Sequence, residues 1–420
     1  MEEVEEETVE KVMEVLEEKE SNGEIEGTSS HNNMSLPPHP SITGINSRNL
    51  LFDLIHHHSY AMFAKLCLEC PDAAGTHKVL ASLFLHDRVL DRAKVISLAT
   101  GNKCIKACNL SMEGESVQDC HAEILTRRGF LRWMYSQIEL YSRQPKKSVL
   151  CINEKGTKLK IRDRYSLHLF ISTAPCGDGR VYQLSSKMGN DQTKLRNVGY
   201  LRHKIEGGEG TVLGQEVKGE SLSVDAMIEG QRLRTMSCSD KILKWNVAGL
   251  QGALLSHFVD PIYMSSLSLA HLYRRSCVSR ACFSRLSSFH PSPPFLLNSS
   301  LHCARSHSLA APLPFPPPKS VSTSLNWNAS DGKVELVDTQ SGRSREGLSR
   351  LSKRQLFSRF SHVNSMVNSS PVPSSLTYLS AKRAAVDYCQ VVMSMKEFLS
   401  EHDMGEWKGK PSDFSLFTLP

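Results

Sequence analysis

The stretch DCHAEILTRRGFLRWMYSQIEL, residues 119–140, decides both how this sequence folds and where its chemistry lies. Ile124, Leu131 and Ile138 recur at helical spacing, so an apolar stripe predicts a long amphipathic helix over about 120–141. His121 and Glu123 stand at its start, two residues apart. The first turn of this helix therefore brings an imidazole and a carboxylate close together.

Two further segments carry a cysteine where a strand ends or a helix begins. The apolar run LHLFIS (167–172) is typical of a buried strand and leads into a Pro-Cys-Gly turn at Cys176. A Ser-Cys-Ser segment at Cys238 opens a second predicted helix, which extends to about residue 258. Both thiols are expected near helix N-termini, where backbone N–H groups favour the thiolate.

One histidine and two cysteines make a ligand set for zinc. His121, Cys176 and Cys238 supply three protein ligands and leave the fourth position for water, whose pKa zinc lowers to roughly 7. Glu123 need not bind the metal and is placed to carry protons. His-Ala-Glu or Pro-Cys-Gly alone is more typical of an ordinary turn, so the prediction depends on all three segments occurring in order.

Four stretches of the sequence closely resemble the adenosine deaminases acting on RNA. They are DCHAEILTRRGF (119–130), HLFISTAPCGDGR (168–180), LRHKIEGGEGT (201–211) and MSCSDKILKWNVAGLQGALLSHF (236–258). Many zinc deaminases space their cysteines as P-C-x-x-C, but position 179 here is glycine, and the resembling family separates its two cysteines by a long insertion, as in this sequence. The resemblance covers roughly residues 50–420, with a gap in likeness over 287–322.

The resemblance implies a fold, a reaction and two cofactors. The fold is α/β, with a cytidine-deaminase-like three-layer core, a mixed sheet with helices on both faces and a C-terminal helical extension. The reaction is zinc-dependent hydrolytic deamination of adenosine to inosine in double-stranded RNA, in which the base is flipped out of the duplex, hydroxide attacks C6 and Glu123 relays protons. The cofactors are Zn²⁺ and a buried inositol hexakisphosphate.

Three positions are expected to contact RNA because they match the family. Glu209, in a GGEG loop, matches the residue that fills the space left by the flipped adenosine, and its glycine neighbours let the backbone approach the RNA. Asn102 matches a position near the target ribose, and Arg180 matches a basic position on the approach to the site. Taken alone, these residues have plainer interpretations: an acidic glycine loop, a Gly-Asn turn and a solvated arginine.

Cations are predicted at the starts of two helices, where positive charge is unfavourable. Arg127 and Arg128 lie in the first turns of one helix, and Lys241 and Lys244 lie near the start of the other. A cation at the positive end of a helix dipole is unfavourable by roughly 0.3–1 kcal/mol, and an anion shared by these cations would offset that free energy. In the resembling family these positions face inositol hexakisphosphate, together with the matches at Lys353, Tyr378, Lys382, Tyr388, Trp407 and Lys410.

Near these cations, two positions differ from the family and two others match it. Val392 stands where the family has a lysine, and Gln118 replaces an asparagine. Asp119 and Lys204 match a family chain of hydrogen bonds that leads from the phosphate site towards the metal.

Charge is distributed unevenly along the 420 residues. The total is +6, but residues 1–26 hold twelve Glu and two Lys, so this segment carries −10 and the remainder +16. A basic body suits a polyanion such as double-stranded RNA. No run reaches the roughly 18 apolar residues of a membrane helix, and no secretory signal is recognisable. We therefore expect the chain in the nucleus or cytoplasm, without a membrane partner.

Composition divides the chain into two parts. We expect an acidic, disordered tail and linker at 1–48 and one deaminase domain at 49–420, with a Ser/Pro-rich flexible insertion at 287–322. Within the domain, the patterns predict two helices over 51–85, loops over 187–220, strands at 94–100, 325–327 and 334–337, and helices near 348–361 and 378–400.

Other interpretations fit parts of the same sequence. Members of the family usually carry RNA-binding domains ahead of the deaminase, whereas the residues before it here are acidic. We therefore expect that the chain binds RNA through the deaminase body alone, that it is a truncated form, or that it works as a homodimer or with an RNA-binding partner protein. A transfer-RNA adenosine deaminase and a catalytically silent, RNA-binding relative are the alternatives. Cys67 and Cys70 have metal-ligand spacing but fall in an apolar helical stripe, which is more typical of packed thiols.

Overall fold

A computed structural model describes most of the chain from Ile45 onward. The described residues are 45–76, 78–181, 198–205, 211–213, 232–298, 301–305, 322–368 and 373–420. The predicted tail at 1–48 lies almost wholly outside this range, and so does the predicted RNA contact Glu209.

The centre of the molecule is a mixed seven-stranded sheet, in the order β10-β9-β5-β1-β2-β11-β12. The β5–β9 and β9–β10 pairs are parallel, and the other pairs are antiparallel. In chain order the strands are β1 Leu80–Asp87, β2 Arg92–Thr100, β5 Tyr165–Thr173, β9 Ser266–His271, β10 His302–Arg305, β11 Thr323–Asn328 and β12 Glu335–Asp338.

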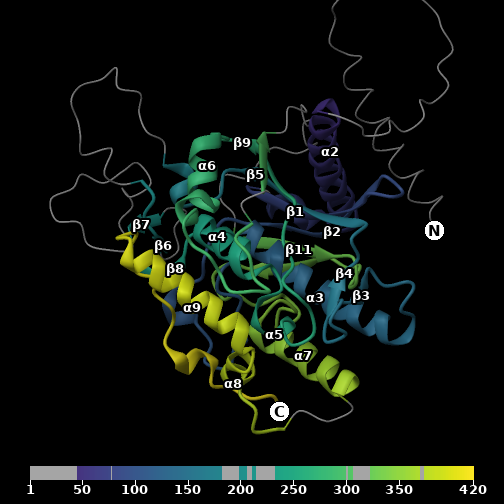
Figure 1. Cartoon of the computed structure of the whole chain (residues 1–420), viewed down its shortest axis with the longest axis vertical. Coiled ribbons are helices and arrows are strands. Elements are labelled where there is room, and N and C mark those ends of the chain that lie inside the picture. Colours follow the sequence, from purple (N-terminus) through teal and green to yellow (C-terminus); the bar gives the residue numbers. More distant parts are fainter. Residues whose placement is uncertain are drawn as a thin grey trace, which may run out of the picture.

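Strand β1 shows that helices cover both faces of this sheet. All eight of its residues are buried. Leu83 and Leu85 pack in the apolar cluster of α3 (Ala122–Arg143), whereas Leu80 and Phe84 pack in the cluster of α2 (Ile45–Glu69). Because alternate side chains of a strand point to opposite faces, the sheet lies between α2 and α3 (Figure 1). The expected three-layer α/β architecture is confirmed.

The remaining helices follow the second ligand segment and form the C-terminal part of the domain. They are α4 Cys238–Ala248, α5 Gly252–Leu255, α6 Arg275–Cys282, α7 Lys353–Asn368, α8 Tyr378–Arg383 and α9 Val386–Glu401. Phe357 and Phe360 of α7 share an apolar cluster with Phe130 of α3, so α7 extends the α3 layer. No helix among the described residues is both long and apolar enough to cross a membrane.

Short elements complete the structure. Two small sheets are built from β3 Leu150–Ile152 with β4 Leu159–Ile161, and from β6 Arg202–Ile205 between β7 Thr211–Leu213 and β8 Arg232–Met236. Single 3-10 turns occur at η1 Pro71–Thr76, η2 Ala107–Asn109, η3 Asp178–Arg180, η6 Ser284–Leu286 and η7 Ser412–Ser415.

The expectation of two helices over 51–85 is wrong. One helix, α2, ends at Glu69, and residues from Leu80 onward belong to β1. A strand that is buried on both faces is a continuous apolar run, and its periodicity does not distinguish it from a buried helix. The helix expected up to residue 258 is also interrupted, because Gly249 has a φ of 81° after the end of α4. In the region predicted as loops, 187–220, strands β6 and β7 form.

The expectation of an exposed Ser/Pro-rich insertion at 287–322 does not hold for the part that the structure describes. Strand β10 lies inside this range and pairs in parallel with β9. Phe289, Phe295 and Leu301 are buried, and the Phe289 ring lies 5.4 Å from that of Phe398 on α9. Apolar residues spaced among the prolines and serines therefore pack this segment onto the domain. Residues 306–321 lie outside the described structure.

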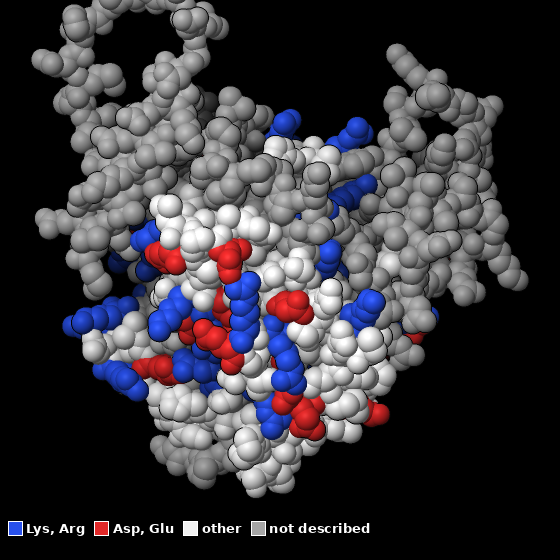
Figure 2. Space-filling model, turned by 180° about the vertical axis from the view of Figure 1, so that it is seen from behind, with Lys and Arg blue, Asp and Glu red and all other residues white. Residues whose placement is uncertain are grey.

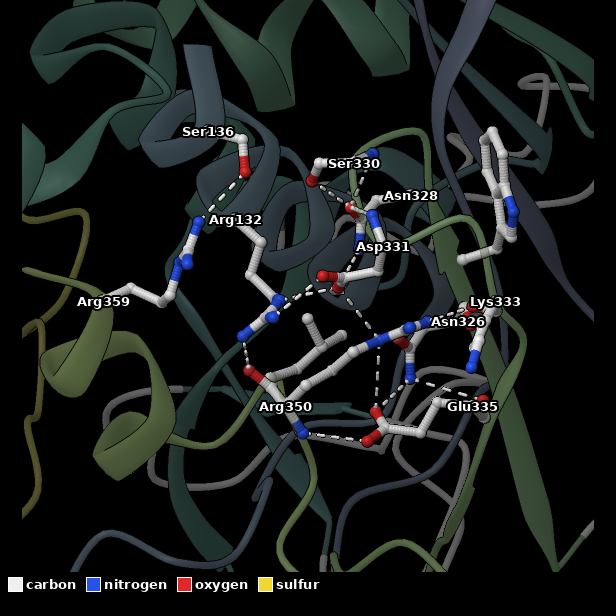
Figure 3. A network of polar contacts seen from close by, with 12 residues as sticks. Arg132, Ser136, Asn326, Asn328, Ser330, Asp331, Lys333, Glu335, Arg350 and Arg359 are labelled. Atoms are coloured by element: carbon white, nitrogen blue, oxygen red, sulfur yellow. Dashed lines mark hydrogen bonds and ion pairs between the residues drawn. The ribbon is translucent and has the colours of Figure 1, made fainter. Parts of the chain in front are cut away.

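A buried polar network joins α3 to the β11–β12 hairpin and the segment before α7 (Figure 3). The Arg132 guanidinium donates two hydrogen bonds to Asp331, at 2.7 and 2.9 Å. Arg350 donates from its side chain to Asn326 at 2.9 Å, and its backbone N–H donates to Glu335 at 2.8 Å. A two-pronged arginine–carboxylate pair fixes orientation as well as distance, so this network sets how the hairpin sits against α3.

Replacing Phe170 by alanine tests the α2 layer. Phe170 is fully buried and stacks on His56 of α2 at 5.2 Å. Loss of a buried phenylalanine costs about 3–5 kcal/mol, and we expect a fall of that size in the free energy of unfolding, measured by urea denaturation. Leu68→Ala on α2, at a side chain 66% exposed, is the control and is expected to stay within about 0.5 kcal/mol of wild type. Equal effects would show that α2 does not cover the sheet.

Candidate metal centre

The three predicted metal ligands meet at one buried point. His121 is the N-cap of α3, Cys176 follows the end of β5, and Cys238 is the first residue of α4. His121 Nδ1 lies 3.5 Å from Cys238 Sγ and 3.9 Å from Cys176 Sγ. The three donor atoms lie within 4.8 Å of one another, as ligands of a single ion require, and all three residues are buried.

Backbone and hydroxyl contacts hold the two cysteines in this arrangement. The backbone N–H and the hydroxyl of Ser239 both donate to the Cys176 carbonyl, at 3.0 and 2.5 Å. The Cys238 N–H donates to Cys176 Sγ at 3.3 Å. Ser237 caps α4 by accepting from the Asp240 N–H at 3.2 Å. The start of α4 and the turn after β5 are therefore fixed against each other by the protein itself.

The charges around the two thiols favour one thiolate. Burial raises the pKa of the Cys176 thiol, but the hydrogen bond from Cys238 and the charge of Lys204 outweigh it and hold that pKa well below its ordinary value. Burial and the neighbouring Cys176 raise the pKa of Cys238 well above its ordinary value. A metal that binds both sulfurs therefore displaces the proton that remains on Cys238.

A cavity of about 320 Å³ opens beside the ligand cluster. Its lining includes His121 and Cys176, together with Glu123 and Asn102. Among the described residues, the buried Oε2 atom of Glu123 and the buried Oδ1 atom of Asn102 have no hydrogen-bond partner. Buried polar atoms are nearly always paired, and a group bound in the cavity would give both atoms a partner. The donor set and the free carboxylate fit a zinc ion with its water.

The structure places two of the three predicted RNA contacts at this cavity. Asn102 and Arg180 both line it, and Arg180 is held in place by donating to the Ala174 carbonyl at 2.6 Å. Glu209 lies outside the described residues. Outside the quoted motifs, the sequence did not predict five other lining residues, namely Tyr60, Lys78, Val79, His271 and Leu272. None lies in a motif, and only the pairing of β5 with β9 and the position of α2 reveal that they share this cavity.

Most of the cations predicted to bind a polyphosphate converge in a second cluster. Trp245 and Trp407 lie under Arg127 and Lys244, at 5.9 and 5.5 Å from the ring centres. The ring of Tyr378 lies 5.6 Å from Lys353 Nζ and 5.4 Å from Lys382 Nζ.

These cations are held mainly by neutral groups. Arg127 donates to the Leu250 carbonyl and Arg128 to the Leu351 carbonyl, at 2.7 and 2.5 Å. Within the described residues, the one ion pair made by the predicted polyphosphate-binding cations is that of Lys241 with Asp119.

The cluster has an excess of half-buried positive charge. Burial and neighbouring cations lower the pKa of Lys353 to about 8 and that of Lys410 to about 6. Burial, followed by repulsion from Arg127 and Lys382, holds the pKa of Lys244 well below its ordinary range. Charges that are buried among like charges are unfavourable unless an opposite charge joins them, so this cluster fits a polyanion.

Lys396 is a member of this cluster that the sequence analysis missed. It lies on α9, close enough to Lys244 for the two charges to repel, and burial followed by the charge of Lys382 lowers its own pKa. Lys396 lies one helical turn after Val392, where the resembling family has a lysine. The spacing i, i+4 places both positions on one face of the helix and is the signal that could have found Lys396.

A chain of polar contacts joins the two sites. Lys204 Nζ donates to both oxygens of Asp119, at 2.9 and 2.8 Å, and to Cys238 Sγ at 3.0 Å. Lys241, a member of the cation cluster, also pairs with Asp119. The predicted relay residues Asp119 and Lys204 therefore belong to one chain of contacts, which connects the cation cluster to the metal ligand Cys238.

The surface charge seen in Figure 2 is mixed rather than uniform. Basic and acidic side chains alternate over this face of the molecule. The described part of this face therefore has no continuous basic or acidic patch. The charged side chains seen here do not identify an RNA-binding surface.

Gly177→Ala tests the packing of the cysteine turn. Gly177 has a φ of 98°, and an added Cβ would lie 2.2 Å from Ser237 Oγ. Gly156 is the control, because it has a φ of 70° and nothing within 4 Å of an added Cβ. Both alanine variants carry the left-handed strain of about 1–2 kcal/mol. We expect Gly177→Ala to lose about 1–3 kcal/mol more in thermal unfolding, whereas equal losses would show that the turn is loosely packed.

Comparison with known proteins identifies the family. Residues 97–411 match the model of the adenosine-deaminase (editase) domain. The double-stranded RNA-specific adenosine deaminase of Mus musculus is 36% identical over 398 residues, which cover 86% of this chain and 32% of the mouse protein. The double-stranded RNA-specific editase Adar of Drosophila melanogaster is 33% identical over 367 residues, which cover 83% of this chain and 52% of that protein.

Transfer-RNA deaminases match the chain over a shorter stretch or at lower identity. The tRNA-specific adenosine deaminase 1 of Drosophila melanogaster is 31% identical over 207 residues, which cover 46% of this chain. The chain spans about a third of the length of the mouse double-stranded RNA-specific enzyme and about half of the fly editase. On the extent of the domain match and of these identities, the chain belongs to the adenosine-deaminase (editase) domain family.

Proposed function

We propose that this chain converts adenosine to inosine in double-stranded RNA by zinc-dependent hydrolysis. The observation that carries the proposal is the meeting of His121, Cys176 and Cys238 beside the free carboxylate of Glu123 at the wall of a cavity. The mouse and fly relatives, which match more than four-fifths of the chain, are named for action on double-stranded RNA. Catalytic silence is disfavoured, because all three ligands and the carboxylate are present.

Zinc held by these three ligands would make water a nucleophile near neutral pH. Glu123 faces the cavity and accepts the proton that water loses as its oxygen bonds to C6 of adenine. The same carboxyl delivers this proton to the purine ring, and then passes the second proton of the former water from the new C6 hydroxyl to the departing amine. One water is consumed and one ammonia is released, so atoms and protons balance without a redox partner.

Access to the cavity supports an extruded base rather than a stacked one. Glu123 is only 2% exposed, and a base inside a duplex cannot reach it. We assign Asn102 to the ribose of the target nucleotide and Arg180 to the approach of its backbone, since both line the cavity. Glu209 is proposed to fill the space left in the duplex, as its match to the family implies.

The transfer-RNA alternative has less support. Relatives named for that substrate are 31% identical over 46% of the chain or 22% identical over 77% of it, whereas those named for double-stranded RNA are 33–36% identical over 83–86%. Three expectations remain predictions from the sequence. They are the location in the nucleus or cytoplasm, the domain boundary at residue 49, and pairing with a second copy or an RNA-binding partner.

We further propose that the cation cluster binds inositol hexakisphosphate. The cluster is half-buried, its aromatic and carbonyl neighbours are neutral, and Asp119 is the one carboxylate paired with its predicted members among the described residues. Six phosphates would satisfy many cations at once, and Lys396 would supply the cation missing at Val392. The contacts Lys241–Asp119–Lys204–Cys238 would link this anion to the metal.

Glu123→Gln tests the catalytic assignment. The amide keeps the shape of the carboxyl but cannot carry protons, so we expect inosine formation to fall by about 10²–10⁴-fold, while zinc content is unchanged. The assay incubates purified protein with a long RNA duplex and, separately, with transfer RNA, and sequences both for A-to-G changes. Editing of transfer RNA alone, or full activity in the variant, would contradict the proposal.

Lys396→Met tests the anion site. The purified chain is denatured and the released inositol phosphate is measured by ion chromatography. A hydrogen bond to a charged group is worth about 1.5–3 kcal/mol, so we expect retention after dialysis to fall by roughly 10-fold or more. Lys408→Met, at a side chain 50% exposed that pairs with Glu406, is the matched control. Equal retention in both variants would remove Lys396 from the site.

A further inference from the structure

Each cysteine ligand is followed two residues later by a deeply buried aspartate. Asp178 follows Cys176 and Asp240 follows Cys238, and both are 0% exposed. Neither belongs to the cluster of donor atoms that can bind the ion. An isolated buried carboxylate is strongly unfavourable unless it is paired and hydrogen-bonded, so each must have a partner of opposite charge.

The partner of Asp178 is Arg280 on α6. Arg280 Nε donates to Asp178 Oδ2 at 2.8 Å, and its Nη2 donates to the Asp178 carbonyl at 3.1 Å. Nη2 also donates to the carbonyl of Val181 at 3.0 Å. The Arg280 guanidinium therefore binds both the backbone and a side chain of the turn that carries Cys176.

The partner of Asp240 is Arg285 on η6, directly after α6. Arg285 Nη2 donates to Asp240 Oδ1, and also to the Ala281 carbonyl at 2.9 Å. The other oxygen of Asp240 accepts from the Ser237 hydroxyl at 2.6 Å and from the Arg202 N–H at 3.0 Å. This pair therefore fixes the first turn of α4, which carries Cys238.

The two pairs also share the short segment between them. Gly199 donates its N–H to Asp178 Oδ1 at 2.8 Å and accepts from Arg285 Nη1 at 3.1 Å. Two arginines five residues apart thus hold both cysteine segments against one scaffold, the α6–η6 segment. Neither arginine lines the cavity beside the metal ligands.

We propose that Arg280 and Arg285 are positioning residues that hold the two sulfurs at metal-ligand spacing. Groups that orient metal ligands typically change metal affinity by 10–100-fold when they are removed. Loss of either arginine would let one cysteine segment move relative to the other and would speed metal release. The inference rests on the proposed function only in taking zinc as the ion.

The experiment measures zinc release from the full-length chain into a chromophoric chelator. We expect Arg280→Gln and Arg285→Gln to release zinc at least 10-fold faster than wild type, and Arg280→Lys, which keeps the charge, to restore part of the difference. The cobalt-substituted protein gives a second readout, because its sulfur-to-metal absorption bands should shift when the cysteine geometry relaxes. The double variant Asp178→Asn/Arg280→Met removes both charges and covers the case in which a lone buried carboxylate prevents folding.

The Arg132–Asp331 pair provides a matched control. It is also a two-pronged pair, at 2.7 and 2.9 Å, but Arg132 lies eleven residues beyond His121 along α3, about 16 Å away. Arg132→Gln and Asp331→Asn/Arg132→Met should lower the thermal midpoint while zinc release stays within about threefold of wild type.

Equal zinc release in the α6–η6 variants and the Arg132 variants, at equal loss of thermal stability, would overturn the inference. A wild-type chain that holds zinc without editing RNA would overturn the proposed function and leave this inference standing. A wild-type chain that retains no zinc would overturn both.

Discussion

Three side chains from three distant segments have to meet before this molecule can do any chemistry. His121 starts α3, Cys176 ends the turn after β5, and Cys238 starts α4. The seven-stranded sheet makes the meeting possible, because β5 is an inner strand and α3 packs on the strands β1, β2 and β11 beside it. Hydrogen bonds from Ser239 to Cys176, together with the pairs Arg280–Asp178 and Arg285–Asp240, hold the two cysteine segments against each other. The protein's own contacts therefore build the metal centre.

The second constraint is electrostatic. Half-buried arginines and lysines from α3, α4, α7, α8, α9 and the C-terminal segment converge in one cluster, where their repulsion disfavours the fold unless an anion is present. Asp119 sits between this cluster and Lys204, which touches Cys238. An anion that stabilises the C-terminal helices would therefore also stabilise the surroundings of the metal, and structure and chemistry would depend on the same buried ion.

Local motifs predicted the metal ligands and Glu123. The other residues of the cavity and of the cation cluster depend on how distant elements pack together. His121, Glu123, Cys176 and Cys238 stand at the ends of strongly periodic elements, so their context was readable from the sequence. Strand β1 was mistaken for a helix, because residues buried on both faces show no alternation.

The missed residues have other physical causes. Tyr60 and Lys78 reach the cavity only because α2 covers the sheet, and no local pattern encodes that contact. Asp178 and Asp240 stand inside the quoted motifs, but their arginine partners lie about 45–100 residues further along the chain. Lys396 lies on α9 one helical turn after Val392, the position at which the family has its lysine. Matching the sequence position by position does not detect a shift of one turn.

The most direct measurement of the central claim is X-ray absorption at the zinc edge of the purified, full-length chain. The account predicts one zinc per chain with two sulfur neighbours at about 2.3 Å and two nitrogen or oxygen neighbours at about 2.0–2.1 Å. The two sulfurs come from Cys176 and Cys238, one nitrogen comes from His121, and the remaining ligand is water. Three or four sulfur neighbours, or a shell of nitrogen and oxygen alone, would contradict it.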